Sequence, residues 1–353
     1  MEEDNDPQML IRAERIICHS AGDGLFQALL VRNGRIGDIC RTSSSSDAVA
    51  LHDFPGCVIA PCFCDYHLHF SGKAAGSGAE VVEELLSHGV VRVYESGDSQ
   101  GAGLEMKTLF RKTIEVVAAG YALFHEGGYG KAIGKVIRDA AQARRTIDAL
   151  IPCGIDYLKI VQSGIYDPVS DRITAGGFAP GDLKEIIAYA KDKMLPVFCH
   201  ANGAQAVSEA VKAGASAIVH GLHVGDETLS EMAGKKIALI PTLYAFQSLH
   251  QLPEQGESAR NIARALDGHR AAVGRAHEMG VKVLPGSDSG PKFIPHGEAF
   301  IGELGLLLQS GIPYDDVIQS ASTGPLQLSH HADFLILEGL EIRNMVRRGN
   351  FLR

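Results

Sequence analysis

The sequence has neither an excess of basic residues nor a long apolar run. Its 353 residues include 33 Lys and Arg against 42 Asp and Glu, which gives a formal net charge of -9 at pH 7. Nucleic acids and anionic membranes bind basic surfaces, so this balance argues against either as a partner. No uncharged run reaches the roughly 20 residues that a membrane-spanning helix needs. Because the acidic residues 1–7 also differ from a signal peptide, which begins basic and continues apolar, we expect a cytoplasmic protein.

A disulfide framework is also missing. The seven cysteines are odd in number, and most of them lie within apolar, strand-like segments. This usage is typical of reduced, buried thiols. Hydrophobic residues make up 45% of the chain and charged residues 21%, so the chain can bury a substantial core and is expected to be globular.

The first sixty residues have no clear helical period. Two short segments with the alternating pattern of β-strands, 9–18 and 29–40, are punctuated by Gly24 and by Asn33-Gly34, and the Asn-Gly pair is a hairpin signal. A polar turn at 43–46 precedes a further strand that leads to Pro61. Residues 1–60 are therefore expected to form a small sheet of their own.

From His67 onwards, strand-like and helix-like segments alternate. A helix is expected at 80–88, closed by Gly89, and a strand at 90–95. Later strands are expected at 120–125, 157–161, 196–200, 217–220, 237–242 and 281–288, and later helices at 137–150, 182–191, 204–213 and 262–279. With the strand before His67, eight strands alternate with helices over about 260 residues, which is typical of a (β/α)8 TIM-like barrel. In such barrels the chemistry takes place at the carboxyl ends of the strands.

One stretch at the start of this region has the composition of a metal-binding strand. The segment Val58-Ile-Ala-Pro-Cys-Phe-Cys-Asp-Tyr-His-Leu-His-Phe70 is an apolar run that ends in His67 and His69. Residues two apart on a strand project from the same face, so both imidazoles can bind one metal ion. The chain has 15 histidines, however, and this spacing alone does not distinguish a metal site from two ordinary histidines.

Four further residues of ligand type lie at or near the ends of later strands. Lys159 lies inside the apolar segment 155–161, where burial would lower the pKa of its amine, so we expect it to be paired, catalytic or chemically modified. His200, His220 and Asp288 each close an expected strand. Each of these residues has an ordinary structural explanation when it is taken singly. Together with His67 and His69, however, these four residues make six ligand-type residues at the ends of five barrel strands, and this pattern predicts a metal site.

The sequence resembles the amidohydrolase superfamily over nearly its whole length. The segment Pro61-Cys-Phe-Cys-Asp-Tyr-His-Leu-His69 resembles the first-strand signature of that family, and the other four residues follow in the expected order. The chain is most similar to the imidazolonepropionase-related and prolidase-like branch of binuclear metal-dependent hydrolases, on segments 158–164, 240–244 and 298–324.

The resemblance also implies a domain organisation. The terminal strands at 332–338 and 342–348 are similar to the returning half of the sheet that the N-terminal segment begins. We therefore expect a small β-sandwich domain formed by residues 1–60 and 325–353. Residues 61–324 would form the (β/α)8 catalytic domain.

The resemblance implies a centre with two divalent metal ions. Its ligands would be His67, His69 and Asp288 for one ion, His200 and His220 for the other, and Lys159, carboxylated by carbon dioxide, as the bridge. Carboxylation turns a cation into a bidentate anion, which offsets the charge of the two ions. Zinc suits these ligands best, although manganese, iron and cobalt fit similar sites.

The implied reaction is hydrolysis of the C–N amide bond of a small molecule. A hydroxide that bridges the ions would be the nucleophile, because the ions lower the pKa of bound water. Asp288 would accept its proton and pass it to the leaving nitrogen, and His220 is the second residue assigned to catalysis. The expected substrate is a dipeptide or an N-acyl amino acid, and the alternative is ring opening of a cyclic amide such as an imidazolone, hydantoin or lactam. Relatives commonly form symmetric oligomers, so a homo-oligomer is expected.

Two departures from the family pattern concern substrate binding. Tyr94 and Glu95 stand where relatives often carry Arg and Asp, and Tyr129 stands where dipeptidase-like members often have His in a Gly-Gly-His-Gly loop. Peptide specificity therefore stays open. The loop residues that could contact a substrate are Tyr244, His125, Tyr129, His223 and Lys292.

Two other functions also stay open. A mononuclear deaminase of the superfamily typically lacks the strand-four lysine and carries a glutamate just beyond the strand-five histidine, whereas this chain has Lys159 and His200-Ala-Asn-Gly203. A non-catalytic barrel would not need six intact ligand positions. Metal content separates the three hypotheses, with about two ions per chain expected for the hydrolase, one for the deaminase and none for the scaffold.

Overall fold

The computed structural model describes residues 8–17, 26–41, 49–70, 78–251 and 256–352. The chain divides into two compact units. The first unit comprises Met1–Cys64, His88–Val91 and Tyr314–Arg353, and the second comprises Asp65–Ser87 and Arg92–Pro313. The acidic segment 1–7, Gly24 and the turn predicted at 43–46 lie outside the described residues.

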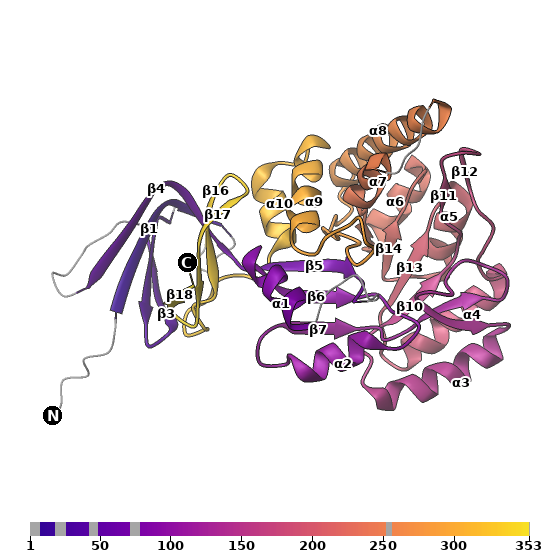
Figure 1. Cartoon of the computed structure of the whole chain (residues 1–353), viewed down its shortest axis with the longest axis horizontal. Helices are drawn as coiled ribbons and strands as arrows, with labels where there is room; N and C mark the ends of the chain where they lie inside the picture. The colour runs from indigo at the N-terminus through magenta and orange to yellow at the C-terminus, as the bar shows by residue number, and fades with distance from the viewer. Residues whose placement is uncertain (1–7, 18–25, 42–48, 71–77, 252–255, 353) are drawn as a thin grey trace. The chain divides into compact units, whose positions relative to one another are not determined.

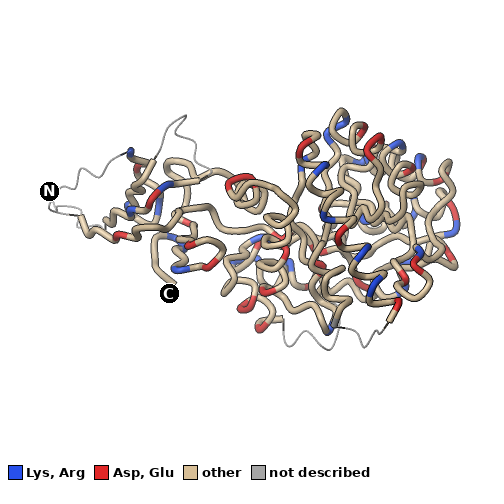
Figure 2. Tube along the Cα trace, turned by 90° about the horizontal axis from the view of Figure 1, so that it is seen from above, with Lys and Arg blue, Asp and Glu red and all other residues tan. Residues whose placement is uncertain are grey.

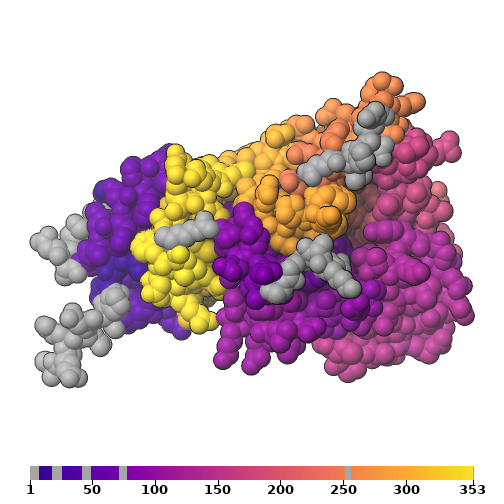
Figure 3. Space-filling view, in the orientation of Figure 1, coloured from indigo at the N-terminus to yellow at the C-terminus, as the bar shows by residue number. Residues whose placement is uncertain are grey.

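A seven-stranded sheet forms the first unit. Its strands, in spatial order, are β18 (Asn350–Phe351), β17 (Glu341–Arg347), β16 (Phe334–Glu338), β4 (Ala50–Pro61), β1 (Gln8–Ile16), β2 (Ala28–Arg32) and β3 (Arg35–Cys40), and helix α10 (Tyr314–Ala321) belongs to the same unit. The hairpin β2–β3 turns at Asn33 and Gly34, which both have positive φ as a two-residue hairpin turn requires. Strand β16 pairs antiparallel with β4, so the C-terminal strands, in yellow, lie beside the N-terminal strands, in indigo (Figure 3).

Parallel strands form the framework of the second unit. One sheet has the order β5 (Phe63–Leu68), β6 (Val90–Glu95), β7 (Glu115–Ala118), and the other has the order β15 (Ala238–Ile240), β14 (Ala217–His220), β13 (Val197–Ala201), β10 (Leu158–Val161), β8 (Ala122–His125), β9 (Gly134–Ile137). A short hairpin, β11 (Tyr166–Asp167) and β12 (Arg172–Ile173), follows β10.

Helices connect these strands. They are α1 (Gly78–Ser87), α2 (Ala102–Leu109), α3 (Ala140–Leu150), α4 (Pro180–Asp192), α5 (Ala204–Ala213), α6 (Asp226–Lys235), α7 (Leu243–Ser248), α8 (Glu257–Glu278) and α9 (Glu298–Gln309), with 3-10 turns at Ile151–Cys153 and Leu249–Gln251. Consecutive helices from α3 to α6 pack against one another, and α4 and α5 cover β13 (Figure 1). This strand and helix alternation confirms the predicted α/β class with parallel strands.

Several predicted strands differ in their bounds from the structure. The strand predicted at 120–125 is found as β8, which begins at Ala122, because Gly120, with a φ of 71°, separates it from β7, a strand that was not predicted. The strand predicted at 237–242 is shorter and ends at Ile240. The strand predicted at 281–288 is reduced to isolated parallel bridges, which join Leu239 to Val283 and Leu68 to Ser289. A regular strand cannot form there because Pro285 has no N–H and Asp288 has a φ of 54°. Among the described residues, the assigned strands therefore form separate sheets, and no closed barrel is seen.

One buried cluster joins the two parallel sheets. Side chains from β13, β14 and β15 and from segments beside the strands meet in it, among them Phe198, Val219, Ile240 and Leu284, and Tyr66 and Tyr94 pack against them. The Tyr94 ring stacks on Tyr66 at a centroid distance of 5.0 Å and on Phe198 at 5.6 Å. Tyr94, where relatives often carry Arg, therefore packs within the core. Glu95 is also buried and accepts hydrogen bonds from the N–H groups of Gly97 and Gly120.

The surface carries charges of both signs. In the second unit, positions of Lys and Arg are interspersed with positions of Asp and Glu along the chain (Figure 2). None of the helices in the described ranges combines the length and the apolar character that crossing a membrane requires. The six described cysteines are free thiols, as predicted. Four of these are buried, but Cys153 is exposed.

Candidate metal centre

The structure places all six predicted ligands in one cavity of about 190 Å³ in the second unit. His67 and His69 lie at the end of β5, Lys159 lies within β10, His200 on β13 and His220 at the end of β14, and Asp288 lies in the turn that follows the bridge at Val283. Because the strands are parallel, their carboxyl ends meet at one edge, and this brings residues that are distant in the sequence together.

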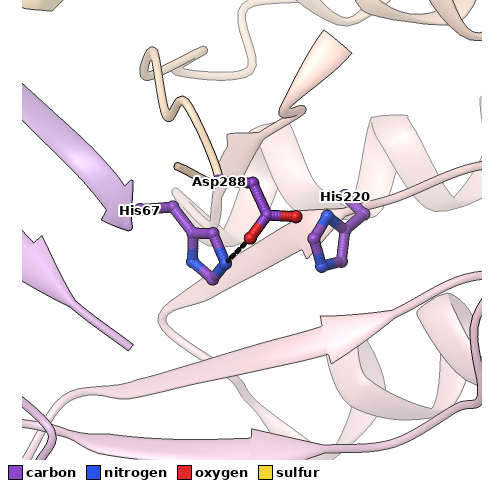
Figure 4. Close-up of side chains that lie close together, drawn as sticks. All are labelled: His67, His220 and Asp288. Carbon is purple, nitrogen blue, oxygen red and sulfur yellow. Dashed lines mark ion pairs between the residues drawn. The ribbon is translucent and has the colours of Figure 1, made fainter. Parts of the chain in front are cut away.

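Asp288 lies between two imidazoles, those of His67 and His220 (Figure 4). Its Oδ1 is 3.2 Å from His67 Nε2 and 3.4 Å from His69 Nε2. The ligand atoms of His67, His220 and Asp288 all lie within 4.8 Å of one another. The ring centroids of His200 and His220 are 4.5 Å apart. This spacing suits a group that could hold a metal ion.

Hydrogen bonds outside the cavity fix how the imidazoles face it. His69 Nδ1 is 2.8 Å from the carbonyl of Gly97, and His200 Nε2 is 3.0 Å from the carbonyl of Gly164. A carbonyl only accepts, so these nitrogens carry a proton and donate. In the neutral rings, the lone pair then lies on Nε2 of His69 and on Nδ1 of His200. Such outer hydrogen bonds are typical of histidines that bind metals.

The other two imidazoles have hydroxyl partners. His67 Nδ1 is 2.7 Å from Ser96 Oγ, and His220 Nδ1 is 2.6 Å from Thr242 Oγ1. In both rings Nε2 is therefore the nitrogen left for the cavity. All four histidines thus use one nitrogen for orientation and keep the other for a ligand.

The electrostatics of the cavity favour a bound cation. Burial lowers the pKa of His200 to about 4, and burial together with the charge of Lys159 lowers that of His67 to about 3. Burial would also lower the pKa of His69, but Asp288 outweighs this effect, and the net shift is upward. A lone pair on His69 and a carboxylate oxygen of Asp288 repel each other unless a proton or a metal ion lies between them. The donor set therefore fits a divalent cation.

Lys159 is 1% exposed and lies at the floor of the cavity. Its Nζ is 3.4 Å from His67 Nδ1, and burial lowers its pKa to about 7. Because this shift favours the neutral amine, Lys159 can react as a nucleophile near neutral pH. Among the lining residues in the described ranges, it is the only lysine or arginine.

Two ligand positions have unusual backbone conformations. His220 has a φ of 69° and Asp288 a φ of 54°, both in the left-handed region that residues other than glycine rarely adopt. Such positions cost of the order of 1–3 kcal/mol each and cluster at functional sites. Here they turn the chain at the strand ends, and the Asp288 N–H donates to the carbonyl of His67 at 2.8 Å.

Asp65, two residues before His67, ties the two ends of the site together. It is fully buried, and burial raises its pKa to about 7. Its Oδ1 accepts hydrogen bonds from the N–H groups of His67 at 3.1 Å and Ser287 at 3.0 Å, and its Oδ2 accepts from the Ser287 hydroxyl at 2.5 Å. One carboxyl group therefore holds the strand that carries His67 against the turn that carries Asp288.

Asp65→Asn is expected to lower the free energy of unfolding by about 1–3 kcal/mol. The side-chain amide of Asn would place an N–H donor opposite another donor of the buried network, and neither would have an acceptor. Urea unfolding measures this difference. Asp226→Asn, on the exposed start of α6, is the matched control, since Asp226 only pairs with Arg275 at the surface. Equal stability of the two variants would show that the Asp65 network does not hold the site.

Glu303 on α9 holds the segment behind His220. It is fully buried, and its Oε2 accepts a hydrogen bond from the Tyr244 N–H at 2.7 Å in the first turn of α7. Its Oε1 has no hydrogen-bond partner within the described part of the chain. Burial raises the pKa of Glu303 to about 8, so its carboxyl group is protonated at neutral pH. The carboxyl group thus fixes the helix that begins directly after Thr242, the hydrogen-bond partner of His220.

Glu303→Gln is expected to gain stability relative to the wild type as pH rises from about 4.5 to about 8. In this range the folded wild type keeps the proton and the unfolded chain loses it, so wild-type stability falls by at most about 1.4 kcal/mol per pH unit from this group. Urea unfolding at several pH values measures the difference. Glu298→Gln, on an exposed position of the same helix, serves as the control. If the difference in unfolding free energy between Glu303→Gln and the wild type stayed constant across this pH range, Glu303 would not be protonated in the folded protein.

Only one of the predicted substrate contacts lines the cavity. Tyr129 does so, and its ring centroid lies 5.3 Å from that of His200. The His125 ring packs against Phe178, and His223 lies near the Tyr166 ring. Tyr244 lies beside α9, and Lys292 is exposed. Among the described residues, these four are not part of the cavity lining.

Several residues of the site were missed at the level of sequence. Asp65 shares a strand face with His67 and His69, and this period of two could have identified it. Asn202 follows His200 by two residues in the same way. Glu303 is a carboxylate on the buried face of an apolar helix, which is a signal in itself. The apolar residues of the cavity, such as Ile165 and Phe293, have no comparable signal because they lie on loops.

Parallel strands bring four histidines, a lysine and an aspartate into one cavity, and this donor set suits divalent metal ions. Residues 58–329 match the amidohydrolase family. The chain therefore belongs to this family, which confirms the resemblance found in the sequence.

Known proteins of similar sequence and structure agree with this assignment. Ochratoxinase from Aspergillus niger is 25% identical over 224 residues, which cover 62% of this chain and 47% of that protein. The chain thus spans about half the length of the curated relatives it matches. Solved structures with a similar fold include a Xaa-Pro dipeptidase with bound methionine in its active site (TM-score 0.81, 19% identity, 98% of this chain and 100% of that chain) and ochratoxinase from A. niger (TM-score 0.80, 19% identity, 99% and 96%). At these identities the structural likeness concerns the fold alone.

Proposed function

We propose that the protein hydrolyses the C–N amide bond of a small substrate, a dipeptide or an N-acyl amino acid, with bound metal ions. The observation that carries this proposal is the orientation of the four histidines. Each has one nitrogen hydrogen-bonded outside the cavity, and the remaining nitrogens face the cavity together with Asp288 and Lys159. Apolar residues would stabilise a core better than these buried polar groups, so a structural role alone does not explain the arrangement.

The proposed cofactor is a pair of divalent ions, with zinc as the first choice because the ligands are imidazoles and carboxylates. Three groups would hold one ion, namely His67, His69 and Asp288, and His200 and His220 would hold the second. Lys159 would bridge them as a carbamate, formed when its neutral amine attacks carbon dioxide and loses a proton. When bound, the ions would polarise the substrate carbonyl and lower the pKa of a water molecule, so that it loses a proton more readily as it attacks the carbonyl.

The chain's own groups would then move the protons. Asp288, which lies between the rings of His67 and His220, would accept the proton of the attacking water and deliver it to the leaving nitrogen. His220 is held by the Thr242 hydroxyl, so its ring cannot turn away from the reacting carbonyl. The products would be a carboxylic acid and a free amine.

The proposal extends to the fold. The bridges Leu239–Val283 and Leu68–Ser289 lie between the two parallel sheets, and the Asp156 N–H donates to the carbonyl of Ala118 at the other junction. Side chains from both sheets share one core cluster. These contacts support a (β/α)8 barrel in which residues 283–289 take the place of the eighth strand.

Mass spectrometry of products tests the reaction. Protein loaded with zinc in the presence of bicarbonate is incubated with dipeptides, N-acyl amino acids and cyclic amides, and its metal content is measured in parallel. An acid and a free amine from a linear substrate would support the proposal. A cyclic compound that gains one water and stays a single molecule would replace it with the ring-opening alternative. Cleavage of no compound, with about two ions bound per chain, would leave the proposal without support.

A further inference from the structure

The cavity above the ligand residues has apolar walls. We propose that these walls bind a bulky apolar or aromatic group of the amide substrate, an inference that rests on the proposed function and narrows its substrate class. Separate segments of the second unit contribute the walls, with side chains that include Tyr129, Ile133, Ile165, Tyr166, Phe246 and Phe293.

Three of these side chains are partly exposed to solvent. Tyr129 is 37% exposed, Ile165 45% and Phe293 36%. Single exposed apolar side chains are ordinary, but three around one cavity form a continuous apolar rim. The rim and the imidazoles line the same cavity, so an apolar group bound against the rim would lie in the cavity that also holds the ligand residues. A substrate with such a group would remove this apolar surface from water.

The wall that carries Ile165 is held in place before any substrate binds. Ile165 precedes the hairpin β11–β12, where the Tyr166 hydroxyl donates to Asp171 at 2.7 Å. Arg264 on α8 also pairs with Asp171, at 2.6 Å, and Asn261 donates to the carbonyl of Pro168 at 2.9 Å. The hairpin is therefore anchored to α8 at two points. A preformed wall lowers the entropic cost of binding a ligand.

Asn202 supplies a neutral polar contact in the same cavity. It is 4% exposed, and its Oδ1 accepts a hydrogen bond from the Leu222 N–H at 3.2 Å. Asn202 lines this cavity and also a second pocket, and its amide nitrogen Nδ2 has no hydrogen-bond partner among the described residues. A donor without a partner in the protein can donate to a ligand oxygen. We assign Asn202 the role of orienting an oxygen of the amide substrate.

Hydrolysis of matched substrates tests the apolar preference. N-acetyl-phenylalanine is expected to have a kcat/KM at least about 10-fold higher than N-acetyl-alanine, and N-acetyl-glutamate a lower value than either. Phe293→Ser and Ile165→Ser should each reduce this preference several-fold. The matched control is Val169→Ser, because Val169 is 70% exposed near the tip of the same hairpin and does not line the cavity. Equal rates for the three substrates would overturn the inference but leave the proposed function standing.

A binding measurement is independent of catalysis. Isothermal titration calorimetry of the metal-free protein with 1-naphthaleneacetamide should show binding with a negative heat-capacity change, the sign of apolar burial. We expect Phe293→Ser, Ile165→Ser and Asn202→Asp each to weaken this affinity about 10-fold, and Val169→Ser to leave it unchanged. Asn202→Asp keeps the acceptor for Leu222, replaces the donor by an acceptor and adds a negative charge. If no compound is cleaved, the proposed function fails, and calorimetry alone decides whether the cavity walls bind an apolar group. If calorimetry shows no binding, or equal affinity in all variants, the inference is overturned.

Discussion

Replacing Asp288 by Asn is expected to reduce kcat/KM by about 1000-fold or more. General acid–base catalysis by one positioned group contributes of the order of 10²–10⁴-fold, and Asn can neither accept nor deliver the proton. The amide also carries no charge to face His67 and His69, so metal affinity should fall as well. Steady-state kinetics on the substrate identified by mass spectrometry, with the metal content of each preparation, measures both effects.

The control for Asp288→Asn is Asp226→Asn, an exposed carboxylate that pairs with Arg275. This variant should keep the activity of the wild type. A loss of activity at full metal occupancy would assign the effect to proton transfer, whereas a loss that follows the metal content would assign it to the ligand role. An Asp288→Asn protein with wild-type kcat/KM would eliminate Asp288 from the mechanism.

Replacing Lys159 by Gln is expected to lower the bound metal from about two ions per chain to one or fewer, and to abolish activity. Gln fills a similar volume but cannot form a carbamate, so nothing would bridge the ions or offset their charge. In the wild type, metal loading should also increase when bicarbonate is present. Elemental analysis after loading and desalting measures both effects.

Lys184→Gln, on an exposed position of α4, is the matched control because it removes the same charge far from any ligand residue in the sequence. It should bind metal as the wild type does. If Lys159→Gln bound two ions, the bridging role would be excluded. If bicarbonate had no effect on the wild type while Lys159→Gln lost metal, Lys159 would act as the free amine.

The sequence predicted the regular part of the second unit well. Strands β6 and β14 and helix α5 have the predicted bounds because their apolar residues follow a clear period. Glycines mark two of the boundaries, since Gly89 lies between α1 and β6 and Gly214 caps the C-terminus of α5. The segment 281–288 was harder to predict. Its apolar start is typical of a strand, but Pro285 and the left-handed Asp288 prevent a regular ladder, and the positive φ depends on tertiary hydrogen bonds that no local pattern reveals.

Ligand residues and substrate contacts differed in how well they could be predicted. The residues His67, His69 and Lys159 lie on strands, where the alternation of two faces fixes the direction of each side chain. The positions proposed for the substrate lie at the ends of strands or in the segments that follow them, where the direction of each side chain depends on tertiary contacts rather than on a local pattern. Of these positions, only Tyr129 lines the cavity, and no sequence pattern indicated Ile165 or Phe293.

The anchored hairpin β11–β12 has a consequence for how this protein could diverge. Its outer part is tied to α8, whereas at its base the Gly164 N–H donates to the carbonyl of Thr174, and the Gly164 carbonyl holds the His200 imidazole. The imidazole of His69 is held by the carbonyl of Gly97, outside the hairpin. Gene duplicates that reshape the hairpin for new substrates would therefore have to preserve its base, because the same backbone orients His200.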